Sequence, residues 1–205
     1  EIVLLHDSTL DRTTNCTGPV ADLTLAELQA RCDAGSWLNE SFAGERVPTL
    51  VQGLQLATAF GMSIILDLKT AGLGPKIAED MKRAKFSMAD AIPSINFESD
   101  NAEIVAHLPN STIMVNQAGM MPDEVRANSA YFNHLRGQGI DIIFPSSRVL
   151  DENGGGNFSI GAHVRGMQVW TWTVDDPAGW HKYTAEGVGA ICTNNPGGLI
   201  ATMSI

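Results

Sequence analysis

The sequence has no long apolar run and is poor in basic side chains. No apolar stretch approaches the roughly 20 residues that cross a bilayer, so we expect no stable membrane span. Lys and Arg number 13 against 23 Asp and Glu, and the formal net charge is -10. A protein that follows nucleic-acid phosphates needs clustered Lys and Arg. The composition therefore argues against a nucleic-acid partner, and a single soluble domain over 1–205 is the simplest interpretation.

Cysteine is also scarce, with three residues at positions 16, 32 and 192. Cys16 and Cys32 flank a short polar segment and can pair, and an unstrained bridge closing such a loop would contribute roughly 3 kcal/mol. Two buried free thiols are the alternative. Four Asn-x-Ser/Thr sequons, which matter only in a chain secreted by a eukaryote, begin at Asn15, Asn39, Asn110 and Asn157. Together these features favour a secreted or periplasmic protein, with a cytoplasmic one as the alternative.

From residue 61 onward, short apolar runs alternate with helical segments. The predicted strands cover residues 62–68, 91–96, 112–115, 140–144, 168–174 and 188–192. The predicted helices begin at Gly74-Pro75, cover 101–107, 122–136 (closed by Gly137) and 159–165, begin after a cap at Asp176, and begin near Pro196. Near-continuous apolar strands separated by helices are typical of parallel strands that are covered on both faces.

Residues 1–60 follow a different pattern. A strand is expected at 1–6, and helices at 25–32 and 50–60 each begin with a capping box, Thr24 to Glu27 and Thr49 to Gln52. The segment between the helices is rich in Gly, Ser and Asn. We therefore interpret 7–49 as an elaborated loop over the rim of the fold, because long loops in compact domains are usually functional or disordered.

Repeated strand–helix units leave two α/β architectures, a doubly wound open sheet and a (β/α)8 barrel. No glycine-rich phosphate loop follows a predicted strand, which argues against a dinucleotide-binding sheet. Polar residues recur at the ends of the predicted strands, namely Asp67, Lys69, Asn96, Asn116, Gln117, Asp175 and Asn194. Barrel enzymes carry their chemistry at that rim, so the pattern favours the barrel. The alternative is that these residues are polar only because the loops that follow strands are exposed to solvent in any fold.

Several ordered motifs resemble one family of phosphodiesterases. They are LHDSTLDRTTN at 5–15 followed by Gly18, LTLAEL at 23–28, DAGSW at 33–37, VPTL at 47–50, ILDLK at 65–69, WTWTVD at 170–175, and 187–196. In this order they resemble the glycerophosphodiester phosphodiesterase (GDPD) family. The resemblance extends over essentially the whole chain, which makes it far more specific than a lone His-Asp pair.

The resemblance implies a (β/α)8 TIM barrel of the PLC-like phosphodiesterase type. It also implies metal-dependent hydrolysis of glycerophosphodiesters to glycerol 3-phosphate and an alcohol. His6 takes the place of a histidine that is general acid or base toward the leaving alcohol, a role that suits an imidazole with a pKa of about 6.5. Asp67 stands where the family has a metal-binding glutamate, and its shorter carboxylate would weaken or shift Mg²⁺ or Ca²⁺. Lys69 matches a lysine that contacts the phosphate, and Trp172 matches an aromatic wall beside the glycerol.

Without the resemblance, the same residues have plainer interpretations. Asp67 can pair with Lys69 on the same face of the strand. Trp172 can belong to the core, and His6 can be a surface or capping residue. The other four histidines, His107, His134, His163 and His181, lie on or near predicted helices without the spacing of metal ligands, and we treat them as structural or solvated.

In the family, a His-Arg pair and a Glu-x-Asp pair precede the position that matches His6, and here five residues precede it. We therefore expect this chain to lack the first one or two βα units and to carry only part of the site, in a parent protein that is active. One alternative is a catalytically impaired GDPD-like binding protein that keeps a phosphate- or glycerol-binding rim. Another is a related phosphodiesterase acting on sphingolipid or lysophospholipid substrates.

Overall fold

The computed structural model describes residues 1–96, 101–117 and 129–204 and contains a six-stranded parallel sheet in the order β1-β2-β3-β4-β5-β6. The strands are β1 (Ile64–Asp67), β2 (Ala91–Ile95), β3 (Met114–Gln117), β4 (Ile142–Pro145), β5 (Gln168–Thr171) and β6 (Ala190–Ile191). Each strand pairs in parallel with the next strand along the chain. All six predicted strands are present, and the sequential parallel order is that of a (β/α) barrel.

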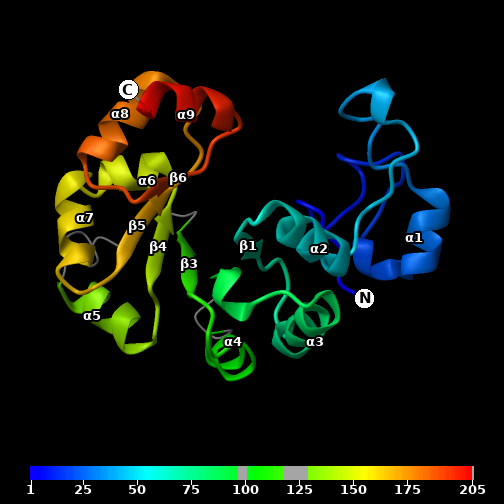
Figure 1. Ribbon diagram of the computed structural model, residues 1–205, viewed down its shortest axis with the longest axis horizontal. Coiled ribbons are helices and arrows are strands. Elements are labelled where there is room, and N and C mark those ends of the chain that lie inside the picture. The colour runs from blue at the N-terminus through cyan, green and yellow to red at the C-terminus, as the bar shows by residue number, and fades with distance from the viewer. Residues whose placement is uncertain (97–100, 118–128, 205) are drawn as a thin grey trace.

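Helices alternate with the strands and pack outside the sheet (Figure 1). They are α1 (Leu25–Arg31), α2 (Leu50–Phe60), α3 (Gly74–Ala84), α4 (Asn101–His107), α5 (Ser129–Gly137), α6 (Ser147–Glu152), α7 (Gly156–His163), α8 (Pro177–Ala185) and α9 (Pro196–Met203). Short 3-10 turns occur at Val20–Asp22, Glu40–Phe42 and Met88–Asp90. Among the helices described, none is long and apolar enough to span a membrane.

The two faces of the sheet have different apolar partners. Leu66 and Leu68 point to the helices and join the main core, which also includes Ile77 and Ile104 from α3 and α4. A second, smaller cluster of Met114, Ile142 and Phe144, with Ile92, Trp170 and Trp172 packed against it, occupies the other face. This second face is the inner face of the sheet. Because successive strand residues point to opposite faces, residues two apart on a strand point to the same face. Asp67 therefore lies on the opposite face of β1 from Leu66.

The helix boundaries follow the capping residues that the sequence predicted. Thr24 and Thr49 both form complete capping boxes. Gly61 ends α2 in the left-handed conformation, with φ 62°, a geometry that glycine adopts without a steric penalty. The side chain of Asp176 accepts a hydrogen bond from the N–H of Gly179 and so caps α8. These local interactions fix where each helix begins, and thereby where each loop leaves the sheet.

The structure differs from the prediction in two regions, residues 1–6 and the chain after β3. Residues 1–6 were expected as a strand, but they are not part of the six-stranded sheet. Val3 forms an isolated antiparallel bridge with Thr49, and the N–H of Leu4 donates to the carbonyl of Pro48 over 2.9 Å. The extended residues just before α2 provide the backbone partners, and the continuous apolar run at residues 2–5 does not reveal which partner is used.

The region after β3 also differs. The helix expected at 122–136 is described as α5 only from Ser129, and residues 118–128 lie outside the described part of the chain. Gly137 is inside α5, and the left-handed residue that follows is Gly139, with φ 82°. Helix α6, capped by Ser146, was not predicted, and α7 begins at Gly156 instead of Ser159. Both helices are short, which weakens their sequence periodicity.

Residues 1–49 form a small unit of their own beside α2, on the side away from β4–β6 (Figure 1). Its core consists of Leu10, Leu28, Cys32 and Val47, all buried. Cys16 and Cys32 form a disulfide, so the predicted pairing is confirmed and the alternative of two free thiols is wrong. That 7–49 covers the rim of the fold stays a prediction.

Two leucines on α2 test how this helix is held against α3. Leu54 is fully buried in the main core, whereas Leu56 is 59% exposed on the same helix. We expect Leu54→Ala to lower the free energy of unfolding by about 2–5 kcal/mol, because it removes buried methyl groups and leaves a cavity. The matched change Leu56→Ala should stay within about 0.5 kcal/mol of the unsubstituted chain in urea unfolding. Equal losses for the two variants would contradict this packing.

Candidate functional site

A polar cluster joins the carboxyl ends of β1 and β2. Asp67 ends β1, and the Nζ of Lys69 lies 2.5 Å from its Oδ2. Asn96, directly after β2, donates from Nδ2 to Asp67 Oδ1 over 3.2 Å and to the carbonyl of Leu68 over 2.6 Å. The ion pair that the sequence offered as the plain interpretation of Asp67 and Lys69 is therefore present. Both side chains are 39% exposed, so each remains accessible to a ligand at the rim.

Polar groups continue along this edge of the sheet. Asn116, the residue before the end of β3, has a buried Oδ1 without a hydrogen-bond partner in the described structure. The side chain of Gln117 is also predicted to lie here, and it falls outside the described part of the structure. Asp175, after β5, accepts hydrogen bonds from the N–H and Nδ2 of Asn194 and from the hydroxyl of Thr193. These bonds, first of all that from the Asn194 N–H, lower the pKa of Asp175.

Trp172 lies on the inner face of the sheet and is half-buried. Its Nε1 donates to the carbonyl of Phe144 over 3.0 Å, and the two rings pack with centroids 6.3 Å apart. The indole is therefore held by the small inner cluster and is also partly accessible. This placement fits the plain interpretation as a core residue, and its role as a wall beside the glycerol stays a prediction.

His6 is part of a three-residue chain of charge-assisted hydrogen bonds. Its Nδ1 lies 2.6 Å from Asp7 Oδ1. Arg12 then binds the same carboxylate twice, from Nε to Oδ2 over 2.6 Å and from Nη2 to Oδ1 over 2.8 Å. The Arg12 guanidinium and, after it, His6 hold the pKa of Asp7 well below its usual range. An ionised Asp7 accepts the proton on Nδ1, and that tautomer leaves Nε2 of a neutral His6 free to accept a proton.

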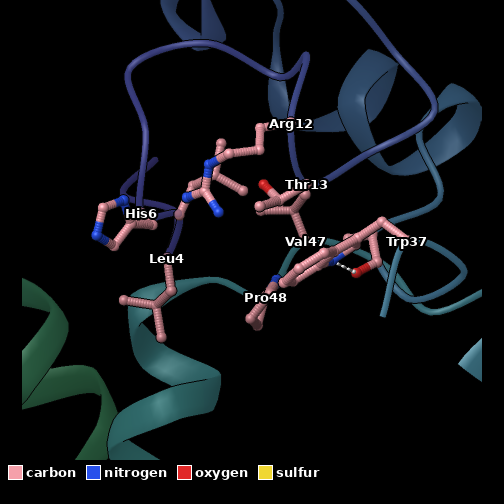
Figure 2. Close-up of a pocket in the computed structure, with 9 residues that line it drawn as sticks. Leu4, His6, Arg12, Thr13, Trp37, Val47 and Pro48 are labelled. Carbon is pink, nitrogen blue, oxygen red and sulfur yellow. Dashed lines mark hydrogen bonds between the residues drawn. The ribbon is translucent and has the colours of Figure 1, made fainter. Parts of the chain in front are cut away.

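The imidazole of His6 stands at one side of an apolar recess of about 330 Å³ (Figure 2). The recess is lined by Leu4, Leu5, His6, Arg12, Thr13, Ala34, Trp37, Val47 and Pro48. Trp37 stands on the far side of it from His6, with its Nε1 bonded to the carbonyl of Ala34 over 2.9 Å. Residues 1–5 and the loop around Trp37 therefore meet beside the candidate proton-transfer group.

The structure brings some predicted site residues together and leaves others apart. Asp67 and Lys69 touch, whereas Trp172 belongs to a separate cluster and His6 bonds to Asp7. The orienting role of Asp7 was missed. Its position directly after His6 was visible, but only the irregular loop fold shows that both groups meet Arg12. The other four histidines lie exposed on α4, α5, α7 and α8, as expected.

Asp67 by itself does not form a divalent-cation site. Mg²⁺ and Ca²⁺ require several oxygen ligands. Over residues 1–96, 101–117 and 129–204, no group of three or more His, Cys, Asp or Glu side chains is placed to hold a metal. Both oxygens of Asp67 are already bonded, one to Lys69 and one to Asn96. The described donors thus do not fit a complete cation site.

The affinity of the chain for cations follows from this arrangement. We expect Mg²⁺ and Ca²⁺ to bind the 205-residue chain with a dissociation constant no tighter than about 1 mM, because one carboxylate must leave Lys69 to coordinate the ion. Isothermal titration calorimetry measures this directly, with Asp67→Asn as the comparison and Asp90→Asn as the control, because Asp90 is exposed and directly precedes β2, at the opposite end of the β1–β2 pair from Asp67. Micromolar binding that Asp67→Asn abolishes would contradict the prediction.

Comparisons with known proteins bear on the family and the fold of this chain. A model of the "Glycerophosphoryl diester phosphodiesterase family" matches residues 1–198. The glycerophosphodiester phosphodiesterase of Caldanaerobacter subterraneus is 28% identical over 206 residues, covering 97% of this chain and 79% of the relative. The YhdW protein of Bacillus subtilis is 28% identical over 207 residues, covering 98% and 79%.

A solved structure shows the same fold. It is an Oleispira antarctica phosphodiesterase in complex with the product sn-glycerol-3-phosphate, with a TM-score of 0.83 at 21% identity, and the match covers 99% of this chain and 79% of that one. The arc of six parallel strands and its outer helices therefore correspond to the barrel of these enzymes, which confirms the predicted α/β barrel type. With its family model matched from residue 1 to 198, this chain belongs to the glycerophosphoryl diester phosphodiesterase family of phosphoric diester hydrolases.

Proposed function

We propose that this protein hydrolyses glycerophosphodiesters to glycerol 3-phosphate and an alcohol. The observation that carries the proposal is the Arg12–Asp7–His6 chain, in a polypeptide that matches the family over residues 1–198. The relative from Caldanaerobacter is named for this activity, and the Oleispira structure contains the corresponding product. Both findings support the substrate class.

His6 is the proton-transfer group in this proposal. A side chain that gives or takes a proton at the reacting oxygen must keep one ring nitrogen free and the ring correctly oriented. Asp7 bonds Nδ1 and leaves Nε2 available, and Arg12 holds Asp7 from the other side. With 76% of its side chain exposed, His6 can meet a substrate without rearrangement of the core. Free Nε2 removes the proton from the hydroxyl group of the water or glycerol moiety that attacks phosphorus, and the protonated ring then donates this proton from Nε2 to the departing alcohol oxygen.

Lys69 binds the phosphate in this proposal, and Trp172 bounds the glycerol. An ammonium beside a phosphodiester stabilises the charge that grows on its oxygens as the ester breaks. Lys69 now donates to Asp67, so a bound phosphate would share or replace this partner. The inner face near Trp172 is apolar, with Phe144 and Trp170, and suits the carbon backbone of glycerol.

Replacing the histidine tests the proposal. We expect His6→Ala to lower kcat for the release of glycerol 3-phosphate from glycerophosphocholine by roughly 100- to 10,000-fold, the usual contribution of general acid–base catalysis. His181→Ala, which removes an exposed histidine from α8, is the matched control and should leave the rate unchanged. A rate that survives His6→Ala would rule out this role for His6.

A catalytically impaired binding protein is the second candidate. The observations in its favour are that Asp67 is neutralised by Lys69 and that, among the described residues, no group of three or more His, Cys, Asp or Glu side chains is placed to hold a metal. Binding of glycerol 3-phosphate without turnover of any glycerophosphodiester would favour this candidate. Faster turnover of a lysophospholipid or sphingolipid in the same assay would favour the related lipid phosphodiesterases.

We also propose that the protein works in an oxidising compartment, outside the cell or in the periplasm. The Cys16–Cys32 disulfide supports this, because such bonds persist mainly in oxidising surroundings. Cys192 is the free cysteine. Peptide mapping of denatured, unreduced protein from its native source should therefore recover Cys16 and Cys32 linked to each other and Cys192 as a free thiol. Recovery of Cys16 and Cys32 as free thiols would contradict the proposal.

A further inference from the structure

Two segments that approach the candidate site meet at one pair of residues. The first is the loop 6–18, which carries His6 and Arg12. The second is the loop 33–46, which carries Trp37. Asn15 donates from its N–H to the carbonyl of Asp33 over 3.1 Å, and Asp33 donates from its N–H to Asn15 Oδ1 over 2.7 Å. This reciprocal pair adjoins the Cys16–Cys32 disulfide.

The carboxylate of Asp33 organises the second loop. Its Oδ1 accepts from the N–H groups of Gly35 over 2.8 Å and Ser36 over 3.1 Å. Its Oδ2 accepts from the N–H of Gly44 over 2.8 Å, which closes the loop eleven residues farther along. Ala34 adds a backbone bond to the carbonyl of Glu45 over 2.8 Å. One side chain therefore fixes both ends of the loop.

Hydrogen bonds within the first loop connect the segment around Asn15 to the segment that carries His6. Thr14 bonds to the carbonyl of Leu10 through both its N–H and its hydroxyl, over 3.1 and 2.7 Å. Leu10 is fully buried, and its N–H donates to the carbonyl of Gly18 over 2.9 Å. Arg12, between Leu10 and Thr14, holds the Asp7 carboxylate that orients His6. A shift of the Asn15 backbone would therefore displace this guanidinium.

The apolar cluster beneath these loops is small. Its buried members are Leu10, Leu28, Cys32 and Val47. So small a core rarely orders long loops without additional ties such as disulfides. The hydrogen bonds of Asp33 and the Cys16–Cys32 disulfide are such additional constraints, and Asp33 directly follows Cys32 in the chain.

We propose that Asp33 is a positioning residue for His6, coupling the loop around Trp37 to the loop that presents the imidazole. The inference rests on the role given to His6 under the proposed function. Asp33 touches no reacting group. Its carboxylate holds the second loop and thereby the Asp33 main chain, which bonds to Asn15 and acts from there through Thr14 and Arg12.

The ionisation state of Asp33 suits this function. Three backbone N–H groups, led by that of Gly44, lower its pKa to about 2. Because the folded pKa lies below the ordinary value of 3.8, the stabilisation is fully present above that pH and is lost as the pH falls through about 2. The coupling is therefore intact at any pH at which a histidine can transfer protons.

Hydrogen exchange tests the coupling separately from catalysis. In Asp33→Ala we expect amide exchange to become at least about tenfold faster in both 6–18 and 34–46, while α3 and α8 exchange as before, since local opening needs only the local bonds to break. Asp33→Asn keeps an acceptor for Gly35 and Ser36 and should restore much of the protection. Asp22→Ala is the matched control, because the Asp22 carboxylate has no hydrogen bond or ion pair within the described ranges.

Kinetics then connect the coupling to His6. We expect Asp33→Ala to lower kcat for glycerophosphocholine by about 10- to 100-fold with KM within about twofold, because a misplaced proton-transfer group affects the transition state more than binding. Asp33→Asn should recover most of this loss. Faster exchange confined to 34–46 would overturn the inference, as would unchanged kcat. Absence of hydrolysis by the unsubstituted chain would count against the proposed function. The rate of amide exchange in 6–18 of Asp33→Ala would still show whether the two loops are coupled.

Discussion

The parallel order of the sheet is the constraint on which the rest of the structure depends. Because each strand pairs in parallel with the next, the carboxyl ends of β1 to β6 meet at one edge. Asp67, Asn96 and Asn116 are brought to this edge from strands that are 20 or more residues apart in sequence. The outer face is filled by helix-facing leucines and isoleucines, so polar residues can be accommodated only at the ends and on the inner face.

Residues 1–49 are held by a different kind of interaction. They have a small apolar core and depend on directed bonds: the disulfide, the Asn15–Asp33 pair and the bidentate contact between Arg12 and Asp7. Packing in the barrel tolerates exchange of one apolar side chain for another, whereas these bonds require particular atoms. The chemistry proposed for His6 thus depends on a part of the chain whose apolar cluster has only four buried members among the described residues.

The sequence predicted the barrel region well because each signal there is local. Apolar runs identified the six strands, and Thr24, Thr49 and Asp176 identified helix starts. It failed where the partner was distant or the pattern was short. Ile2 to Leu4 have a strand pattern but pair with Pro48 to Leu50, and the six-residue α6 has too few turns to show a period.

Site residues were predictable to a different extent. The family motif identified His6, Asp67, Lys69 and Trp172 as candidates, and strand alternation placed Lys69 beside Asp67. Neither source predicted that Asp7 orients His6 or that Asp33 binds the N–H groups of Gly35, Ser36 and the more distant Gly44. Those contacts depend on irregular loop geometry, for which no periodicity exists in the sequence.

The most direct measurement of the central claim is a titration of the isotope-labelled chain with sn-glycerol 3-phosphate followed by NMR. If the edge of the sheet and the His6 loop form one phosphodiester site, the signals of Lys69 Nζ, Asn96 Nδ2 and the His6 ring will shift together along a single binding curve. Shifts confined to distant basic side chains such as Lys182, with no change at Lys69 and His6, would contradict the account.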